Sequence, residues 1–216
     1  MPRLLDQIRF HALKFLYDIF FAIMIRDASW QKPLFESIAP EANSRVLNFG
    51  PGSVSSTRTL ALRFPEVSFI GVDPNRKAVE KARQGIVGRG TPNLTVVEAP
   101  CHAPLPFDAG SFNKVVLVLT LHDRPPDEKL NIAKEMLRVL RRGGTLHVAD
   151  YDKPAVPGEA AVLKLARYIS GPAAAEPHLD GSWTEFLAKA GFTAIRRQSS
   201  HSVRVGRISV VKARKR

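Results

Sequence analysis

The chain has 216 residues, of which 44% are hydrophobic, which is enough for one sizeable core and short for two independent domains. Its 32 Lys and Arg residues outnumber 20 Asp and Glu residues, and the net charge of +12 favours polyanions such as nucleic acid or an acidic membrane surface as partners. The single cysteine, Cys101, excludes an intramolecular disulfide, so a cytoplasmic protein is expected.

The first 40 residues contain an amphipathic segment. Apolar side chains recur at helical spacing from Leu5 to Ile23, and charged residues lie on the other side. The longest uninterrupted apolar run, Ile19 to Ile25, is far shorter than the ~20 residues of a membrane span, and the charges disfavour a signal peptide. We expect residues 1–40 to form an amphipathic helical cap over a hydrophobic face, with a lid or membrane-surface helix as the alternative.

In the domain expected over residues 41–216, short apolar runs alternate with helical patterns. Strands are predicted at 45–49, 67–72, 94–98, 114–119 and 144–150. Helices are predicted from the glycines after the first strand to about residue 64, over about 75–84 and over 127–140. Strands separated by helices imply crossover connections, and hence a parallel sheet with helices on both faces. The turn from Arg141 to Gly144 is predicted to end the longest helix, because glycine permits a left-handed cap.

The C-terminal part predicts a helix at 162–169 followed by a loop, a helix at 183–190 ended by Gly191, and strands at 192–198 and 203–212. These two strands are expected to form a hairpin at the sheet edge. The fold class is therefore α/β: a Rossmann-like, seven-stranded, mostly parallel sheet with helices on both faces and a C-terminal antiparallel hairpin. From Ala194 onward there are eight basic residues and no acid, which indicates a solvated tail, with anionic lipid and RNA as alternative partners.

A glycine turn follows the first predicted strand. Gly50 and Gly52 let the backbone approach a ligand closely, and Asp73, which ends the second strand 21 residues after Gly52, can bind both hydroxyls of a ribose. Val54 and Ser55 lie where a dinucleotide site needs a third glycine to place pyrophosphate on the helix. The pattern therefore favours a nucleoside ligand without phosphates over NAD, and a purely structural turn is the alternative.

Four blocks carry a resemblance to a known family. They are VLNFGPGS at 46–53, FIGVDP at 69–74, PLPFDAGSFNKVVLVLTLHD at 104–123 and EMLRVLRRGGTLHVADYDKP at 135–154. In this order and spacing they resemble the class I S-adenosylmethionine (SAM)-dependent methyltransferases of the ubiquinone/menaquinone C-methyltransferase (UbiE-like) type, over roughly residues 17–154. The resemblance implies SAM as the cofactor and methyl transfer as the activity.

The resemblance also implies roles for individual residues. It places the methionine part of SAM against Gly50 and Gly52, the ribose on Asp73 with Pro74 alongside, adenine near Cys101 and His102, the sulfonium near Leu119 and His122, and Tyr17 over the cofactor.

Three positions depart from the family pattern. Asn48 stands where an acidic residue is usual, Val54 replaces a glycine, and Cys101 replaces an Asp. A non-catalytic or altered-chemistry relative therefore stays open as an alternative.

Methyl transfer from a sulfonium needs mainly alignment of the nucleophile and exclusion of water. Where a catalytic base is needed, His122 and His102 are the candidates, because imidazole titrates near neutral pH. A hydrogen-bonded loop residue is the alternative role for each. Metal catalysis is not supported, because no pair of His or Cys has ligand spacing.

The acceptor is expected to be a small, apolar or membrane-associated molecule, quinone- or lipid-like. The phenylalanines of the first helix and the basic C-terminus favour such an acceptor and a peripheral contact with an anionic membrane. A nucleic-acid-binding methyltransferase is the less favoured alternative, because residues 119–122 lack the Asn/Asp-Pro-Pro-aromatic motif of the base-methylating enzymes. The oligomeric state stays open.

Overall fold

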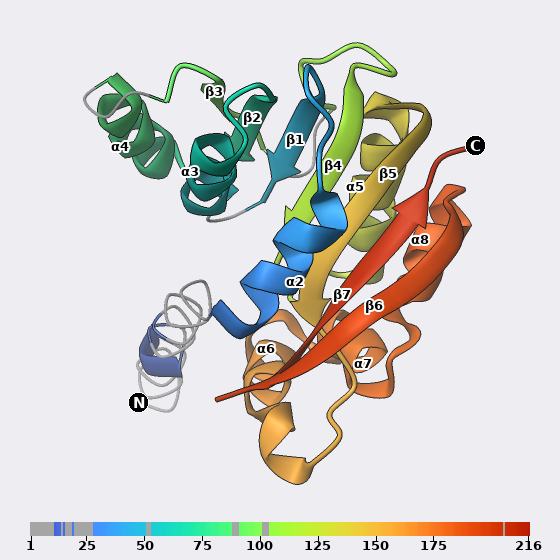
Figure 1. Ribbon diagram of the computed structural model, residues 1–216. Coiled ribbons are helices and arrows are strands. Elements are labelled where there is room, and N and C mark those ends of the chain that lie inside the picture. The colour runs from blue at the N-terminus through green and yellow to red at the C-terminus, as the bar shows by residue number, and fades with distance from the viewer. Residues whose placement is uncertain are drawn as a thin grey trace.

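A seven-stranded sheet in the order β3-β2-β1-β4-β5-β7-β6 forms the centre of the protein (Figure 1). The structure, a computed structural model, describes residues 11–13, 15, 19, 28–50, 53–87, 91–100, 104–204 and 206–216. The strands are β1 (Arg45–Phe49), β2 (Ser68–Asp73), β3 (Leu94–Glu98), β4 (Phe112–Val118), β5 (Leu140–Tyr151), β6 (Thr193–Val203) and β7 (Gly206–Arg214). Strands β1 to β5 are parallel, whereas β7 runs antiparallel to both β5 and β6. The predicted fold class is confirmed.

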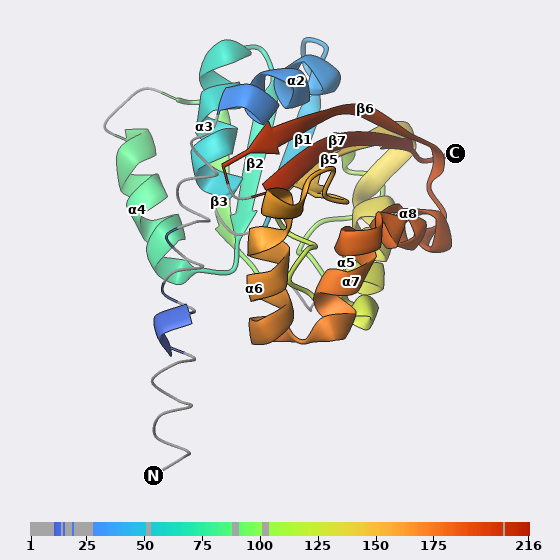
Figure 2. The ribbon, with the colours of Figure 1, turned by 90° about the horizontal axis from the view of Figure 1, so that it is seen from below.

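Helices cover both faces of this sheet. They are α2 (Ala28–Ile38), α3 (Ser53–Arg63), α4 (Arg76–Val87), α5 (Pro126–Val139), α6 (Ala161–Ser170), α7 (Pro172–Asp180) and α8 (Glu185–Ala190), with short 3-10 turns at Pro157–Ala160 and Ser182–Thr184. Figure 2 shows α2 and α3 on one side of the sheet and α5 and α8 on the other.

The alternation of side chains along the strands divides the interior into two cores. In β4, Val116 and Val118 face the core that includes Trp30 and Leu34 of α2. Their neighbours Val115 and Leu117 face the other core, which includes residues of α5 and α8. Successive strand residues point to opposite faces, so a strand buried on both faces is apolar throughout. This is why the parallel strands could be recognised as continuous apolar runs.

The segment after residue 170 corrects a prediction. A loop was expected there, but Pro172–Asp180 forms the helix α7, which packs against α6. Pro172 occupies the first turn, where the missing N–H costs nothing, and Gly171 and Gly181 bound the helix with positive φ angles. The helix brings His178 into the interior, where it is fully buried.

The turn predicted at 141–144 also differs. Helix α5 ends at Val139, and Leu140 is already extended, with its N–H bonded to the carbonyl of Met136. The glycines therefore lie inside β5. A Cβ at Gly144 would lie 2.9 Å from the carbonyl oxygens of Arg141 and Asn113, so this glycine allows β5 to approach β4 rather than capping the helix.

Most of the predicted N-terminal helix lies outside the described residues. Those described within it, at positions 11–13, 15 and 19, are helical, and the side chains of Phe15 and Ile19 are 65% and 39% exposed. Helix α2 follows and packs its buried Trp30, Leu34 and Ile38 into the first core. Within the described part of the chain, no helix is both long and apolar enough to cross a membrane.

Candidate functional site

The carboxyl ends of three strands converge at Gly50. Its N–H donates a hydrogen bond to the carbonyl oxygen of Val72 in β2, 3.0 Å away. Gly50 has a φ angle of +123°, and a Cβ at this position would overlap Oγ1 of Thr120, which follows β4. Only glycine therefore fits where β1, β2 and β4 meet. This is the place at which open α/β sheets bind ligands.

Asp73 is the last residue of β2 and its side chain is 1% exposed. Its Oδ1 accepts a hydrogen bond of 2.8 Å from the backbone N–H of Asn75, across the exposed Pro74. This bond fixes the orientation of the carboxylate at the strand end. A carboxylate held in this place is suited to accept hydrogen bonds from a vicinal diol.

Asn48 precedes Gly50 by two residues and is fully buried in β1. Its Nδ2 donates a hydrogen bond of 2.8 Å to Oγ of Ser56. The bond ties β1 to the helix that follows the glycine turn. The amide at this position therefore has a structural contact with α3.

Backbone geometry changes abruptly after β4. Leu119 has a φ angle of +48°, which non-glycine residues adopt uncommonly, and its N–H donates to the carbonyl of Ala149, 2.8 Å away. The hydroxyl of Thr120 donates back to the carbonyl oxygen of Val118 at 2.9 Å. Non-glycine residues with strained backbone angles are often found in active sites.

Asp150, near the end of β5, holds this turn in place. Its Oδ2 accepts hydrogen bonds from the backbone N–H groups of Thr120 and Leu121, at 3.1 and 2.7 Å. Its Oδ1 lies 2.8 Å from Nδ1 of His122, and both side chains are fully buried. Burial acts to raise the pKa of Asp150, but the attraction of His122 and the hydrogen bond from it prevail and lower that pKa to about 2.

Because the Asp150 carboxylate can only accept, Nδ1 of His122 carries the proton of this hydrogen bond, and Nε2 is the ring nitrogen left to exchange a proton with an acceptor. An acceptor molecule can reach His122 only if the residues that cover it move, since its side chain has no exposed surface.

Lys129 of α5 is buried beneath the same turn and is 0% exposed. Its Nζ donates to the carbonyl oxygens of Leu121 and Arg124, both at 2.5 Å, and to that of Ala174 in α7 at 2.8 Å. Burial lowers the pKa of Lys129 to about 8. One ammonium group thus connects the segment that carries His122 to α7.

His178 of α7 completes the buried polar cluster. Its Nδ1 donates to the carbonyl oxygen of Tyr151 at 2.6 Å, and its ring stacks on Trp183 with centroids 5.3 Å apart. The Tyr151 ring meets His122 edge to face at 4.8 Å. Burial lowers the pKa of His178 to about 3 and raises that of Tyr151. Among the described residues, neither Nε2 of His178 nor the hydroxyl of Tyr151 has a hydrogen-bond partner.

The structure thus brings some of the predicted site residues together. Gly50, Asp73 and Leu119 lie at the ends of three adjacent strands, and His122 follows the same turn as Leu119. Tyr17, Gly52, Cys101 and His102 lie outside the described residues.

Sequence reasoning missed Lys129, Tyr151 and His178. For Lys129 a signal existed, because it lies three and four residues before the buried Ile132 and Ala133, on the core-facing side of α5. For His178 there was none, because the helix that carries it was not predicted.

Among the described residues, no group of three or more His, Cys, Asp or Glu side chains is arranged to hold a metal ion.

Comparison with known proteins agrees with this geometry. Residues 46–144 match the family model described as a methyltransferase domain. The chain is 26% identical over 187 residues to a demethylmenaquinone methyltransferase from Clavibacter sepedonicus, covering 78% of this chain and 74% of the relative. It is 27% identical over 133 residues to the ubiquinone/menaquinone biosynthesis C-methyltransferase UbiE of Geobacter sp. (strain M21), covering 61% of this chain and 55% of that relative.

Solved structures share the fold. The structure described as PigF with SAH matches with a TM-score of 0.68 and 18% identity, covering 94% of this chain and 67% of that one. A SAM-dependent methyltransferase from Methanosarcina mazei matches with a TM-score of 0.63 and 21% identity, covering 83% of this chain and 96% of the other. The resemblance predicted from the four sequence blocks is confirmed.

Proposed function

We propose that this chain, a SAM-dependent methyltransferase with the class I fold, transfers the methyl group to a small apolar acceptor of the quinone type. The observation that carries the choice of acceptor is the similarity to relatives named demethylmenaquinone methyltransferase and ubiquinone/menaquinone biosynthesis C-methyltransferase.

The described residues fit the cofactor. Gly50 admits no Cβ at the junction of β1, β2 and β4, and the carboxylate of Asp73 is held at the adjoining strand end. We assign Gly50 to the methionine part of SAM, Asp73 to the ribose hydroxyls, and Leu119 to the surroundings of the sulfonium. Bound SAM supplies a methyl group that is already activated for transfer.

Tyr17, Asn48, Gly52, Pro74, Cys101 and His102 complete the proposed cofactor site. Asn48 contributes through the position of β1 and α3, since its amide is bonded to Ser56.

The role proposed for His122 is that of a base. Methylation of a ring carbon replaces a C–H bond with a C–CH3 bond, so a proton must leave the acceptor. When the residues that cover His122 move to admit the acceptor, Nε2 can take that proton, and the Nδ1–Asp150 hydrogen bond stabilises the imidazolium that results. His102 is the second candidate base.

An apolar acceptor also agrees with the front of the chain. Phe15 and Ile19 are four positions apart in the sequence, each has helical backbone, and both are exposed. Neighbouring exposed apolar side chains are typical of surfaces that contact apolar ligands or a membrane. We therefore propose that this helix guides the acceptor and that the protein contacts a membrane peripherally.

Cofactor binding is tested by isothermal titration calorimetry of SAM and S-adenosylhomocysteine into wild type, Asp73→Asn and Asp108→Asn. Asp108 is an exposed loop acid and serves as a charge-matched control. We expect binding to wild type and the control, and at least a tenfold weaker affinity in Asp73→Asn, about 1.4 kcal/mol. Equal affinity in all three proteins would contradict the proposed role of Asp73.

Acceptor choice is tested separately with radiolabelled SAM. A demethylated naphthoquinol with an isoprenoid tail, presented in detergent micelles, is compared with the same ring lacking the tail and with single-stranded RNA. We expect label in the tailed quinol, and none in His122→Asn at neutral pH. Label in RNA alone would show that the protein methylates nucleic acid and not a quinone. SAM binding without label in any acceptor would contradict the quinone proposal and leave the cofactor site intact.

A further inference from the structure

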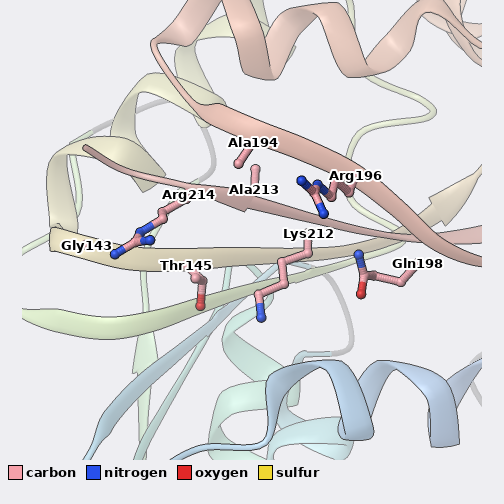
Figure 3. A pocket seen from close by; sticks show the side chains of 8 residues that line it. All are labelled: Gly143, Thr145, Ala194, Arg196, Gln198, Lys212, Ala213 and Arg214. Atoms are coloured by element: carbon pink, nitrogen blue, oxygen red, sulfur yellow. The ribbon is translucent and has the colours of Figure 1, made fainter.

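Two adjoining clefts lie where β5 begins, beside the start of β6 and the end of β7. Figure 3 shows the side chains that line the first of them. The first, of about 350 Å³, is lined by Thr145, Arg196, Gln198, Lys212 and Arg214, among others. The second shares Gly143 and Arg214 with it and adds Arg142 and Arg216. We call the two together the hairpin groove. It lies at the start of β5, whereas the proposed cofactor site lies at the carboxyl ends of β1, β2 and β4.

Strand register places three cations of the groove, Arg196, Lys212 and Arg214, on one face. Lys212 of β7 lies directly opposite Arg196 of β6 and, on its other side, opposite His147 of β5. Arg214 lies opposite Thr145. In Figure 3 the side chains of Lys212 and Thr145 point the same way from neighbouring strands. Like charges directly opposite in a sheet are destabilising, so folding alone does not favour this pairing.

Other basic residues of the C-terminal segment have structural partners. Arg197 pairs with Asp152 at 2.6 Å and Arg207 with Glu159 at 3.8 Å. Lys215 donates to the carbonyl oxygens of Leu137 and Leu140, both at 2.7 Å, at the end of α5. The predicted solvated tail is therefore largely a built part of the fold.

The cations of the groove differ from these. Within the described residues, Arg196, Lys212 and Arg214 form no ion pair. Lys114 of β4 lies beside Thr145 of β5. Burial lowers the pKa of Lys114, and the positive charge of Lys212 lowers it further. The charge of Glu41 opposes this effect at Lys114. The pKa of His147 is lowered to about 3 by burial, Lys114 and Lys212. Because no described acid forms an ion pair with Arg196, Lys212 or Arg214, the protein neutralises the positive field of the groove only in part.

We infer that the hairpin groove binds the sugar-phosphate backbone of single-stranded nucleic acid. The cations follow one another along a concave track, which suits a chain of phosphates, and Thr145 and Gln198 add hydrogen-bonding groups. A bilayer surface is too flat to enter a groove, and no large apolar side chain among the described lining residues could insert into one. The lining also has no described aromatic residue for stacking bases, so binding is expected to depend little on sequence.

The test is fluorescence anisotropy with a labelled oligouridylate, using the full chain. The groove variant Arg196→Glu/Arg214→Glu is compared with Lys81→Glu/Arg204→Glu, which makes the same change in net charge at exposed positions outside the groove. We expect affinity to fall at least about tenfold in the groove variant and much less in the control. For three or four phosphate contacts, the logarithm of the wild-type association constant should fall with that of salt at a slope of about −2 to −3.

A second measurement needs no variant. Acetylation of lysines in the wild-type protein, followed by mass spectrometry, should show that the oligouridylate protects Lys212 and leaves Lys81 unprotected. Equal loss of affinity in the two double variants, or equal protection of the two lysines, would overturn the inference in favour of bulk charge attraction. Binding to phosphatidylglycerol vesicles that depends on Arg196 and Arg214, without binding to RNA, would overturn it in favour of a membrane.

Discussion

Nδ1 of His122 lies 2.8 Å from Oδ1 of Asp150, and neither side chain is exposed to solvent. The same carboxylate accepts the N–H groups of Thr120 and Leu121. The turn after β4 is therefore held on a single charged group from β5. Charge-assisted hydrogen bonds in a buried setting are strong, and an unpaired partner left behind is costly.

Asp150→Asn should destabilise the protein strongly. The amide can accept from only one oxygen and carries no charge, so His122 and the two backbone N–H groups lose part of their pairing. We expect a loss of about 3–5 kcal/mol in the free energy of unfolding at pH 7, measured with urea. Asp123→Asn, which removes a partly exposed acid 3.5 Å from Arg124, should cost less than about 1 kcal/mol. Similar losses of unfolding free energy in the two variants would show that the buried His122–Asp150 pair contributes little to stability.

Gly50→Ala should be incompatible with the strand junction. The new Cβ would overlap Oγ1 of Thr120. The alanine would also have to adopt a φ angle of +123°, which favours glycine. Overpacking and backbone strain each cost about 1–3 kcal/mol, so we expect a loss of about 2–6 kcal/mol in the free energy of unfolding. Gly158→Ala is the control, because nothing lies within 4 Å of a Cβ there. If Gly50→Ala were as stable as wild type, the side chain of Thr120 would have to move away from residue 50 at little cost.

The fold was largely predictable, because its signals are local. Each parallel strand is a short apolar run bounded by turn residues, and β1 was predicted with the bounds it has in the structure. The hairpin of β6 and β7 was also predicted, although β6 extends to Val203 instead of ending at residue 198. Helix α7 was not, because it contains Pro177 and small residues without a clear apolar stripe, and its helical state depends on packing against α6.

The site was less predictable than the fold. Gly50 and Asp73 stand in a recognisable motif beside predicted strand ends, so their proximity followed from the topology. The contact of Lys129 with Ala174, 45 residues away, and that of His178 with Tyr151 depend on how helices dock on the sheet. No local pattern reports such docking, so the buried polar cluster became visible only in three dimensions.

Two buried histidines should make the protein sensitive to acid. The pKa of His147 and that of His178 are both lowered from 6.5 to about 3, mainly by burial. The unfolded chain therefore binds protons first as pH falls below about 6.5, and stability present at neutral pH is lost between pH 6.5 and 3. Each histidine should contribute a slope of about 1.4 kcal/mol per pH unit.

The measurement is the free energy of unfolding in urea at several pH values from 4.5 to 7.5 (roughly the range in which the unfolded histidine titrates). His178→Gln should lower the slope by the contribution of one proton. His201→Gln, at a half-exposed position on β6, should leave it unchanged. An unaltered slope in His178→Gln would mean that His178 is protonated in the folded protein.

Lys129→Met should remove the hydrogen bonds that connect the segment carrying His122 to α7. Three carbonyl oxygens, those of Leu121, Arg124 and Ala174, lose a charged donor in a buried place, while the methionine fills most of the volume. We expect a loss of about 2–4 kcal/mol in the free energy of unfolding at pH 7. Lys134→Met changes an exposed lysine of the same helix and should cost less than about 0.5 kcal/mol.

The pH dependence gives this prediction a sharper form. Burial lowers the pKa of Lys129 from 10.5 to about 8, so the folded protein releases this proton before the unfolded chain does. The stability due to Lys129 should therefore rise as pH increases from 8 to 10.5, by up to about 1.4 kcal/mol per pH unit. The difference in unfolding free energy between wild type and Lys129→Met, measured in urea at pH 7, 8, 9 and 10 (roughly one step per unit of the titration), should widen accordingly. A constant difference across this range would show that Lys129 stays charged in the folded protein, held by the three carbonyls more strongly than burial opposes it.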